Sequence, residues 1–160
     1  MYDILIVGAG PAGTALAAAL NRAGLRVAGL TPADPAAPWI NTYGIWVDEL
    51  AHLDLPNVLG RRWTDTSAYM HGPEIPLHRT YALFDNAKLQ AHLLGQCAAG
   101  GMTWHHGKAA RIDHSAHAST VTGEDGSTIS ARLVVDASGH FPALVRRPAK
   151  ANVAYQAAYG

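Results

Sequence analysis

The sequence predicts an α/β fold built on a parallel sheet, and three observations predict it. Residues Tyr2–Val7 form a short apolar run rich in β-branched side chains, which is typical of a strand buried on both faces. A glycine turn and an alanine- and leucine-rich helix over residues 11–23 follow, with Gly24 as the expected stop. A second apolar strand over residues 25–30 completes a strand–helix–strand unit, so the two strands should be parallel.

The rest of the chain should add a second helix, a hairpin and a further parallel strand. Asp85 is placed to cap a helix over residues 86–99, whose apolar face includes Cys97. Glu124-Asp125-Gly126 is a strong turn signal between two β segments. The other expected elements are a loop at 31–38, a helix at 48–53, irregular β structure at 63–77, strands at 102–105, 109–114 and 120–122, and a buried parallel-type strand at 131–136.

Composition indicates one globular domain. The chain has 160 residues, of which 49% are hydrophobic and 15% charged, and its net charge is zero. This balance gives no sign of a nucleic-acid partner. The lone Cys97 excludes an intramolecular disulfide and fits a reducing compartment. No apolar run reaches the roughly 18 residues of a membrane span, and the glycine-interrupted N-terminus is interpreted as structure rather than a signal peptide.

The strongest chemical signal is the segment Gly8-Ala9-Gly10-Pro11-Ala12-Gly13. Gly8 would allow the tight turn out of the strand, Gly10 the approach of a pyrophosphate, and Gly13 close packing of helix on strand. The free N–H groups at the helix N-terminus would then bind the anion. Because the motif follows a strand and opens a helix, it favours dinucleotide binding over a purely structural turn.

The position that usually holds a ribose hydroxyl with a carboxylate is Thr31, and Asp34 lies three residues further on. We expect Thr31 to do this in preference to Asp34. Asp136-Ala137-Ser138-Gly139 follows the last expected strand, where it is either a second cofactor contact or an ordinary turn. The aromatic segment 41–46 either returns toward a cofactor ring or forms a structural cluster.

No metal site or nucleophile is expected. His105 and His106 are adjacent and would point to opposite faces of a strand, so they cannot share one ion. His114 and His117 flank a loop without cysteine or carboxylate ligands at suitable spacing. Cys97 is interpreted as a core residue.

Five segments together resemble the lycopene cyclases, in particular the lycopene β-cyclases of cyanobacteria and plant plastids. The most discriminating is Asn41-Thr42-Tyr43-Gly44-Ile45-Trp46-Val47-Asp48-Glu49. The others are the glycine turn at 8–13 and residues 81–89, 131–139 and 155–160.

The resemblance implies an α/β, Rossmann-like FAD-binding domain of the glutathione-reductase type over residues 1–160, with a parallel sheet and a β-hairpin insertion. Segments around 40–80 and 150–160 would begin a substrate domain. The fold is expected to be incomplete at the C-terminus, to lack at least one central strand and to leave an unpaired edge. The parent enzyme would use FAD and NADPH to cyclise the ends of lycopene to β-ionone rings, at the surface of a cytoplasmic or thylakoid membrane.

By position, the resemblance implies that FAD contacts Gly8, Gly10, Pro11, Ala12, Gly13, Thr31, Asp136, Ala137 and Gly139. Two departures are Ile40, where the family usually has proline, and Asn86, where many related flavoproteins have arginine. No catalytic proton donor can be assigned, so the isolated chain is not expected to cyclise lycopene. The alternatives are a flavin-dependent monooxygenase and a non-catalytic, truncated FAD-binding fragment.

Overall fold

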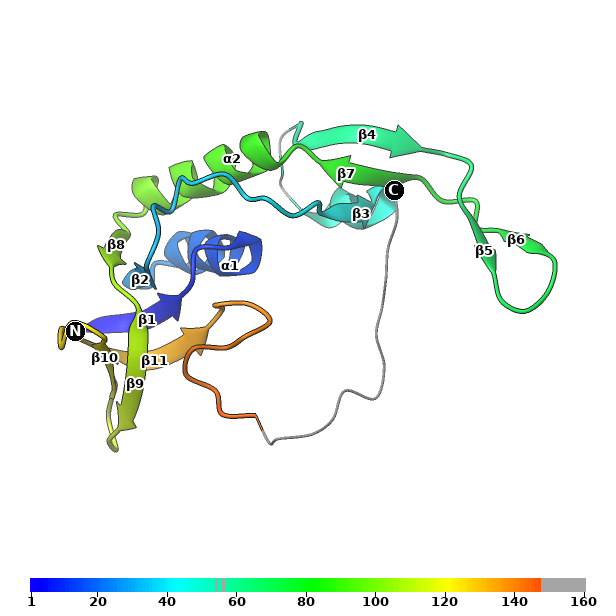
Figure 1. Ribbon diagram of the computed structural model, residues 1–160. Helices are drawn as coiled ribbons and strands as arrows, with labels where there is room; N and C mark the ends of the chain where they lie inside the picture. Colours follow the sequence, from blue (N-terminus) through cyan, green and yellow to red (C-terminus); the bar gives the residue numbers. More distant parts are fainter. Residues whose placement is uncertain (54, 56, 148–160) are drawn as a thin grey trace.

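The computed structural model describes residues 1–53, 55 and 57–147. Its largest element is a six-stranded sheet (Figure 1) in the order β8-β2-β1-β11-β10-β9. The strands are β1 (Tyr2–Val7), β2 (Val27–Thr31), β8 (Thr103–His106), β9 (Ala109–His114), β10 (Ser119–Gly123) and β11 (Thr128–Asp136). The expected segment at 150–160 lies outside the described residues.

The predicted strand–helix–strand unit is confirmed. β1 and β2 are parallel, with Ile4 paired to Val27. The helix α1 (Pro11–Arg22) joins them, and its C-terminal turn ends at Gly24, which has a φ of +81°. Glycine tolerates that left-handed conformation without steric cost, so it stops the helix there.

β11 has two kinds of neighbour. On one side it pairs in parallel with β1, from Tyr2 opposite Ala131 to Val7 opposite Asp136. On the other side its first residues pair antiparallel with β10, which in turn pairs with β9. The predicted hairpin turn is present, since the N–H of Gly123 donates to the carbonyl of Ser127. One strand therefore joins the hairpin insertion to the parallel sheet.

One expectation about this sheet stays a prediction, and another is wrong. The missing strand stays a prediction, because residues 133–136 of β11 pair with β1 on one side and with no described strand on the other. The segment 131–136 is not uniformly buried, since Leu133 is 55% exposed while Ala131 is fully buried. The reason is that α1 packs against β1 and β2, so helix cover lies over that part of the sheet.

The helices form the core with one face of the sheet. α2 (Asn86–Ala99) begins as predicted, with the Asp85 carboxylate accepting the backbone N–H of Lys88 at 3.2 Å. Cys97 is 1% exposed and its thiol approaches the carbonyl of Thr14, so its interpretation as a core residue is confirmed. The buried cluster contains Ile4, Ile6, Ala17, Ala18, Val27, Val58, Leu89, Leu93 and Cys97.

The chain between β2 and α2 forms two small sheets that extend away from the large one (Figure 1). The first contains β3 (Gly44–Trp46), β7 (Tyr81–Phe84) and β4 (Leu59–Trp63), and the second pairs β5 (Ser67–Tyr69) with β6 (Glu74–Pro76). The helix expected at 48–53 is a 3₁₀ helix, η1 (Val47–His52). At six residues it is longer than most 3₁₀ segments.

Candidate functional site

A pocket of about 630 Å³ lies where β1 and β2 end and α1 begins. Its wall includes the glycine turn at 8–12, Thr31, Lys108 and the segment 137–139. The carboxyl ends of parallel strands beside a helix N-terminus are the usual binding position in open α/β sheets. Of the predicted contacts, Gly8, Gly10, Pro11, Ala12, Thr31, Ala137 and Gly139 line the pocket, whereas Gly13 and Asp136 do not.

The three glycines of the turn have different structural roles. Gly8 has a φ of +109°, and a Cβ there would lie 2.5 Å from the carbonyl oxygen of Ala137. A Cβ on Gly13 would collide with the carbonyl oxygen of Gly8. Gly10 differs from both, because a Cβ there would meet no protein atom within 4 Å. Gly8 and Gly13 therefore serve chain packing, while Gly10 keeps space open beside the pocket.

The N-terminus of α1 is suited to an anion. Its N-cap is Gly10, no side chain caps the helix, and the first turn contains no acidic residue. Pro11 at the first helical position has no N–H, so the free donors of this turn are the N–H groups that follow it. Lys108 is the one charged side chain in the pocket wall among the described residues, and it pairs with Glu124 at 2.6 Å.

Thr31 and Asp34 lie in different places. Thr31 is 5% exposed, lines the pocket, and its Oγ1 accepts the backbone N–H of Ala33 at 3.4 Å. The Asp34 carboxylate accepts the N–H of Ala36 at 2.8 Å, in an exposed turn outside the pocket wall. The Thr31 hydroxyl keeps its proton available for an acceptor in the pocket.

Asp136 organises the loop after β11. Its Oδ1 accepts the N–H of Ser138 at 3.1 Å and the Ser138 hydroxyl at 2.5 Å, and its Oδ2 accepts the N–H of Leu144 at 2.7 Å. Burial raises the pKa of Asp136, but the hydrogen bonds from Ser138, Leu144 and Val145 outweigh it, and the net pKa is lowered. Asp136 thus affects the pocket indirectly, because it holds the loop whose residues 137–139 line the pocket.

Sequence reasoning missed the role of Trp39. Its indole Nε1 donates to the carbonyl of Ala9, in the glycine turn, at 3.1 Å. Asn86 holds the same segment from α2, because its Nδ2 donates to the carbonyls of Trp39 at 3.2 Å and Asn41 at 2.8 Å. The departure at Asn86 was visible in the sequence, but its partners could be known only from the fold.

The segment 41–46 divides between the two interpretations given for it. Asn41 and Tyr43 line the pocket, whereas Trp46 packs edge-to-face against Tyr81, with ring centroids 5.2 Å apart. Ile40, the other departure, is 95% exposed. One end of this segment therefore belongs to the pocket and the other to the three-stranded sheet.

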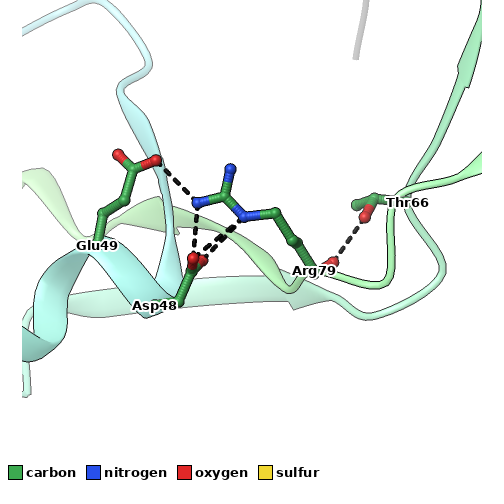
Figure 2. Close-up of polar contacts among 4 residues, drawn as sticks. All are labelled: Asp48, Glu49, Thr66 and Arg79. Carbon is green, nitrogen blue, oxygen red and sulfur yellow. Dashed lines mark hydrogen bonds and ion pairs between the residues drawn. The ribbon is translucent and has the colours of Figure 1, made fainter.

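Arg79 binds the two carboxylates that follow this segment, Asp48 and Glu49 (Figure 2). Its guanidinium donates from Nε and Nη2 to Asp48, with the shortest distance 2.7 Å, and from Nη2 to Glu49 at 2.8 Å. It also lies over the Trp46 ring, 4.6 Å from the centroid. The side-chain hydrogen bond from Arg79 lowers the pKa of Asp48. Asp48 is therefore ionised near neutral pH and is a poor proton donor.

His105 and His114 each have a different side-chain partner. The His105 ring forms a hydrogen bond with the Tyr2 hydroxyl at 3.0 Å, and His114 forms one with Ser119 at 2.8 Å. Over residues 1–53, 55 and 57–147, no three histidine, cysteine or carboxylate side chains gather as metal ligands would. No helix in this part of the chain combines the length and hydropathy required to cross a bilayer.

The fold defines a Rossmann-like α/β protein with a pocket at the glycine turn. Comparison with solved structures agrees. The chain matches AlpK with a TM-score of 0.67 and 25% identity, over 89% of this chain and 33% of that one. It matches the halogenase PltM, solved with phloroglucinol and FAD, with a TM-score of 0.63 and 16% identity, over 88% and 35%. The second likeness shows the fold alone.

The chain belongs to the lycopene cyclase family, whose profile, described as "Lycopene cyclase protein", matches residues 3–160. It is 49% identical to a lycopene beta cyclase of Synechococcus elongatus, over all of this chain and 39% of that protein. It is 35% identical to the chloroplastic lycopene beta cyclase of Solanum lycopersicum, over all of this chain and 32% of that protein. The chain thus spans about two fifths of the length of the first relative and about a third of the length of the second. The resemblance inferred from the sequence is confirmed.

Proposed function

We propose that this chain is the FAD-binding part of an enzyme that cyclises the ends of lycopene to β-ionone rings. Membership of the lycopene cyclase family supports the reaction, and two relatives are lycopene beta cyclases by name. The pocket supports the cofactor, and the observation that carries this assignment is the open space at Gly10 beside the uncapped helix. Residues 1–160 form this cofactor-binding domain, and the region around 40–80 begins the substrate domain.

The pocket residues fit FAD in position and chemistry. The pyrophosphate would lie at Gly10-Pro11-Ala12, where the helix N-terminus offers N–H donors and a positive dipole end. The Thr31 hydroxyl would bind the adenosine ribose, and Ala137 and Gly139 would border the cofactor on the side of β11. Gly8 and Gly13 hold the turn and the helix in place. Asp136 acts through its loop.

When bound and reduced, FAD would supply negative charge near a carbocation on the substrate, and NADPH would keep the flavin reduced. The protein residues bind and orient the cofactor. We assign no proton donor among the described residues, and Asp48 is held ionised by Arg79. Lycopene dissolves in membranes, so the enzyme would work at the surface of a cytoplasmic or thylakoid membrane.

The test is reconstitution of the full-length protein with FAD and NADPH on liposomes that contain lycopene. The expected product is β-carotene, detected by chromatography, and its formation should depend on added FAD. A Gly10→Ala variant should lose FAD binding and product together. Absence of cyclic product, combined with oxygen consumption linked to NADPH oxidation, would contradict the proposal and favour a monooxygenase.

The same experiment should be run on residues 1–160 alone. We expect this fragment to form no cyclic carotenoid, because no proton donor is assigned to the described residues. Formation of β-carotene by the fragment would contradict that expectation and would place the catalytic acid within it.

A further inference from the structure

The carbonyl of Ala9, in the middle of the glycine turn, has two side-chain donors. The Trp39 indole Nε1 donates to this oxygen at 3.1 Å. The Thr14 hydroxyl lies 3.3 Å from it and 3.0 Å from the carbonyl oxygen of Gly10, so its single proton is shared between the two. Neither Trp39 nor Thr14 belongs to the pocket wall, although Ala9 and Gly10 do. The two donors therefore hold the carbonyl on the side of the turn away from the pocket.

This constraint fixes the next N–H group. The described chain has no cis peptide bond, and a trans peptide points its C=O and N–H in opposite directions. Holding the oxygen of Ala9 toward Trp39 therefore turns the N–H of Gly10 toward the opposite side, where the pocket lies. Because glycine accepts both signs of φ, the Ala9–Gly10 peptide could flip at low local cost unless another group held it.

We propose that Trp39 is a positioning residue of the anion site. Its indole N–H holds the Ala9–Gly10 peptide so that the turn presents an N–H group, and not a carbonyl oxygen, to the pyrophosphate of a dinucleotide. A flipped peptide would place the negative end of its dipole against a negative ligand. This inference rests on the proposed function, because it requires the pocket to take a pyrophosphate-containing cofactor.

The backbone that carries the indole is held by the second helix. Asn86 binds the carbonyls of Trp39 and Asn41, and Gln90 one turn later binds those of Pro35 at 3.0 Å and Ala37 at 2.8 Å. These amide donors hold the segment that carries Trp39 against α2. The ring of Trp39 also packs edge-to-face on Tyr43, with centroids 6.2 Å apart. The glycine turn is thereby linked to α2 through Trp39.

The test compares two ligands that differ by the diphosphate group. In the full-length protein, Trp39→Phe keeps an aromatic ring and removes the N–H donor. The affinities for ADP and for adenosine are measured by competition with FAD. We expect the affinity for ADP and FAD to fall about fivefold, which corresponds to one hydrogen bond, while the affinity for adenosine stays unchanged.

Two further variants are measured in the same way, one as a control and one as a second test. Trp63→Phe is the matched control, because Trp63 packs on Tyr81 in the three-stranded sheet, away from the turn. It should leave both affinities unchanged. Thr14→Val keeps a similar volume and removes the hydroxyl that is shared between the carbonyls of Ala9 and Gly10. It should also lower the affinity for ADP and leave the affinity for adenosine unchanged. It provides the test if Trp39→Phe does not fold.

The outcomes separate this inference from the function on which it rests. Unchanged ADP affinity in both Trp39→Phe and Thr14→Val would overturn the positioning role while leaving the FAD site intact. An equal loss for ADP and adenosine would also overturn it, because that pattern indicates a general loosening of the pocket. If the unmodified protein binds neither FAD nor ADP, the proposed function fails, and the role of Trp39 fails with it.

Discussion

The Oδ2 atom of Asp136 accepts the backbone N–H of Leu144 at 2.7 Å, so the last side chain of β11 closes the loop that follows the strand. Pairing with Val7 sets the position of Asp136 in the sheet. The same carboxylate binds the hydroxyl and the N–H of Ser138 through its other oxygen. One side chain thus fixes the wall of the pocket at residues 137–139 relative to the glycine turn.

Asp136→Asn should lower both stability and FAD affinity. The amide replaces one acceptor oxygen with a donor that faces N–H groups, so we expect a loss of about 1–3 kcal/mol in the free energy of unfolding. Urea unfolding measures this loss, and FAD titration measures the effect on the pocket. Asp113→Asn is the control, because Asp113 is an exposed partner of Arg111 at 3.0 Å. Equal stability of the two variants would contradict the role of Asp136.

The contribution of Asp136 should also depend on pH. Its pKa in the folded chain lies below the ordinary value of 3.8, because its hydrogen bonds outweigh burial. Its stabilising effect is therefore complete above the unfolded pKa, and it is lost as the pH falls through the folded pKa. The gap in unfolding free energy between the unmodified chain and Asp136→Asn should narrow from about pH 7 to about pH 3. A constant gap would contradict this.

Alanine at Gly10 and at Gly8 should have different effects. Gly10→Ala adds a methyl group to open space, so the chain should keep its melting temperature and lose FAD affinity. Gly8→Ala combines a φ of +109° with a collision at Ala137, so it should lose at least about 1–3 kcal/mol of stability as well. Thermal unfolding and FAD titration of both variants separate the two effects. Unchanged FAD binding in Gly10→Ala would place the pyrophosphate elsewhere.

Thr31→Val should weaken FAD binding more than it weakens binding of riboflavin, which lacks the adenosine half. Removing one hydroxyl hydrogen bond should cost about two- to tenfold in FAD affinity. Asp34→Asn is the control, because the Asp34 side chain caps an exposed turn. Flavin fluorescence titrations give both affinities. A larger effect from Asp34→Asn would assign the ribose to that residue instead.

Arg79→Lys should disturb the environment of Trp46 although it keeps the charge. Lysine cannot reproduce the fork that binds Asp48 or the planar stack over the indole. Near-ultraviolet circular dichroism should change at the tryptophan bands, while far-ultraviolet spectra stay the same. The effect on stability should be small and should shrink with added salt, because the groups are exposed. Unchanged tryptophan bands would contradict the stack.

Local patterns were sufficient to predict the parallel unit and much of the pocket. β1, α1 and the cap at Asp85 follow from apolar runs, helix formers and one side-chain acceptor, all of which are short-range signals. The glycine turn was predictable for the same reason. The exposure of Leu133 was not, because it depends on where the helices lie over the sheet. The Trp39–Ala9 hydrogen bond spans 30 positions and could be known only from the fold.

The pairing of β1 with β11 has a consequence for the order in which the protein is made. β1 lies in the middle of the sheet, and its partner β11 is synthesised about 130 residues after it. Gly8 packs against Ala137, so this contact also cannot form until residue 137 has been synthesised. The nascent chain therefore contains the glycine turn long before residues 137–139 can complete the pocket wall beside it.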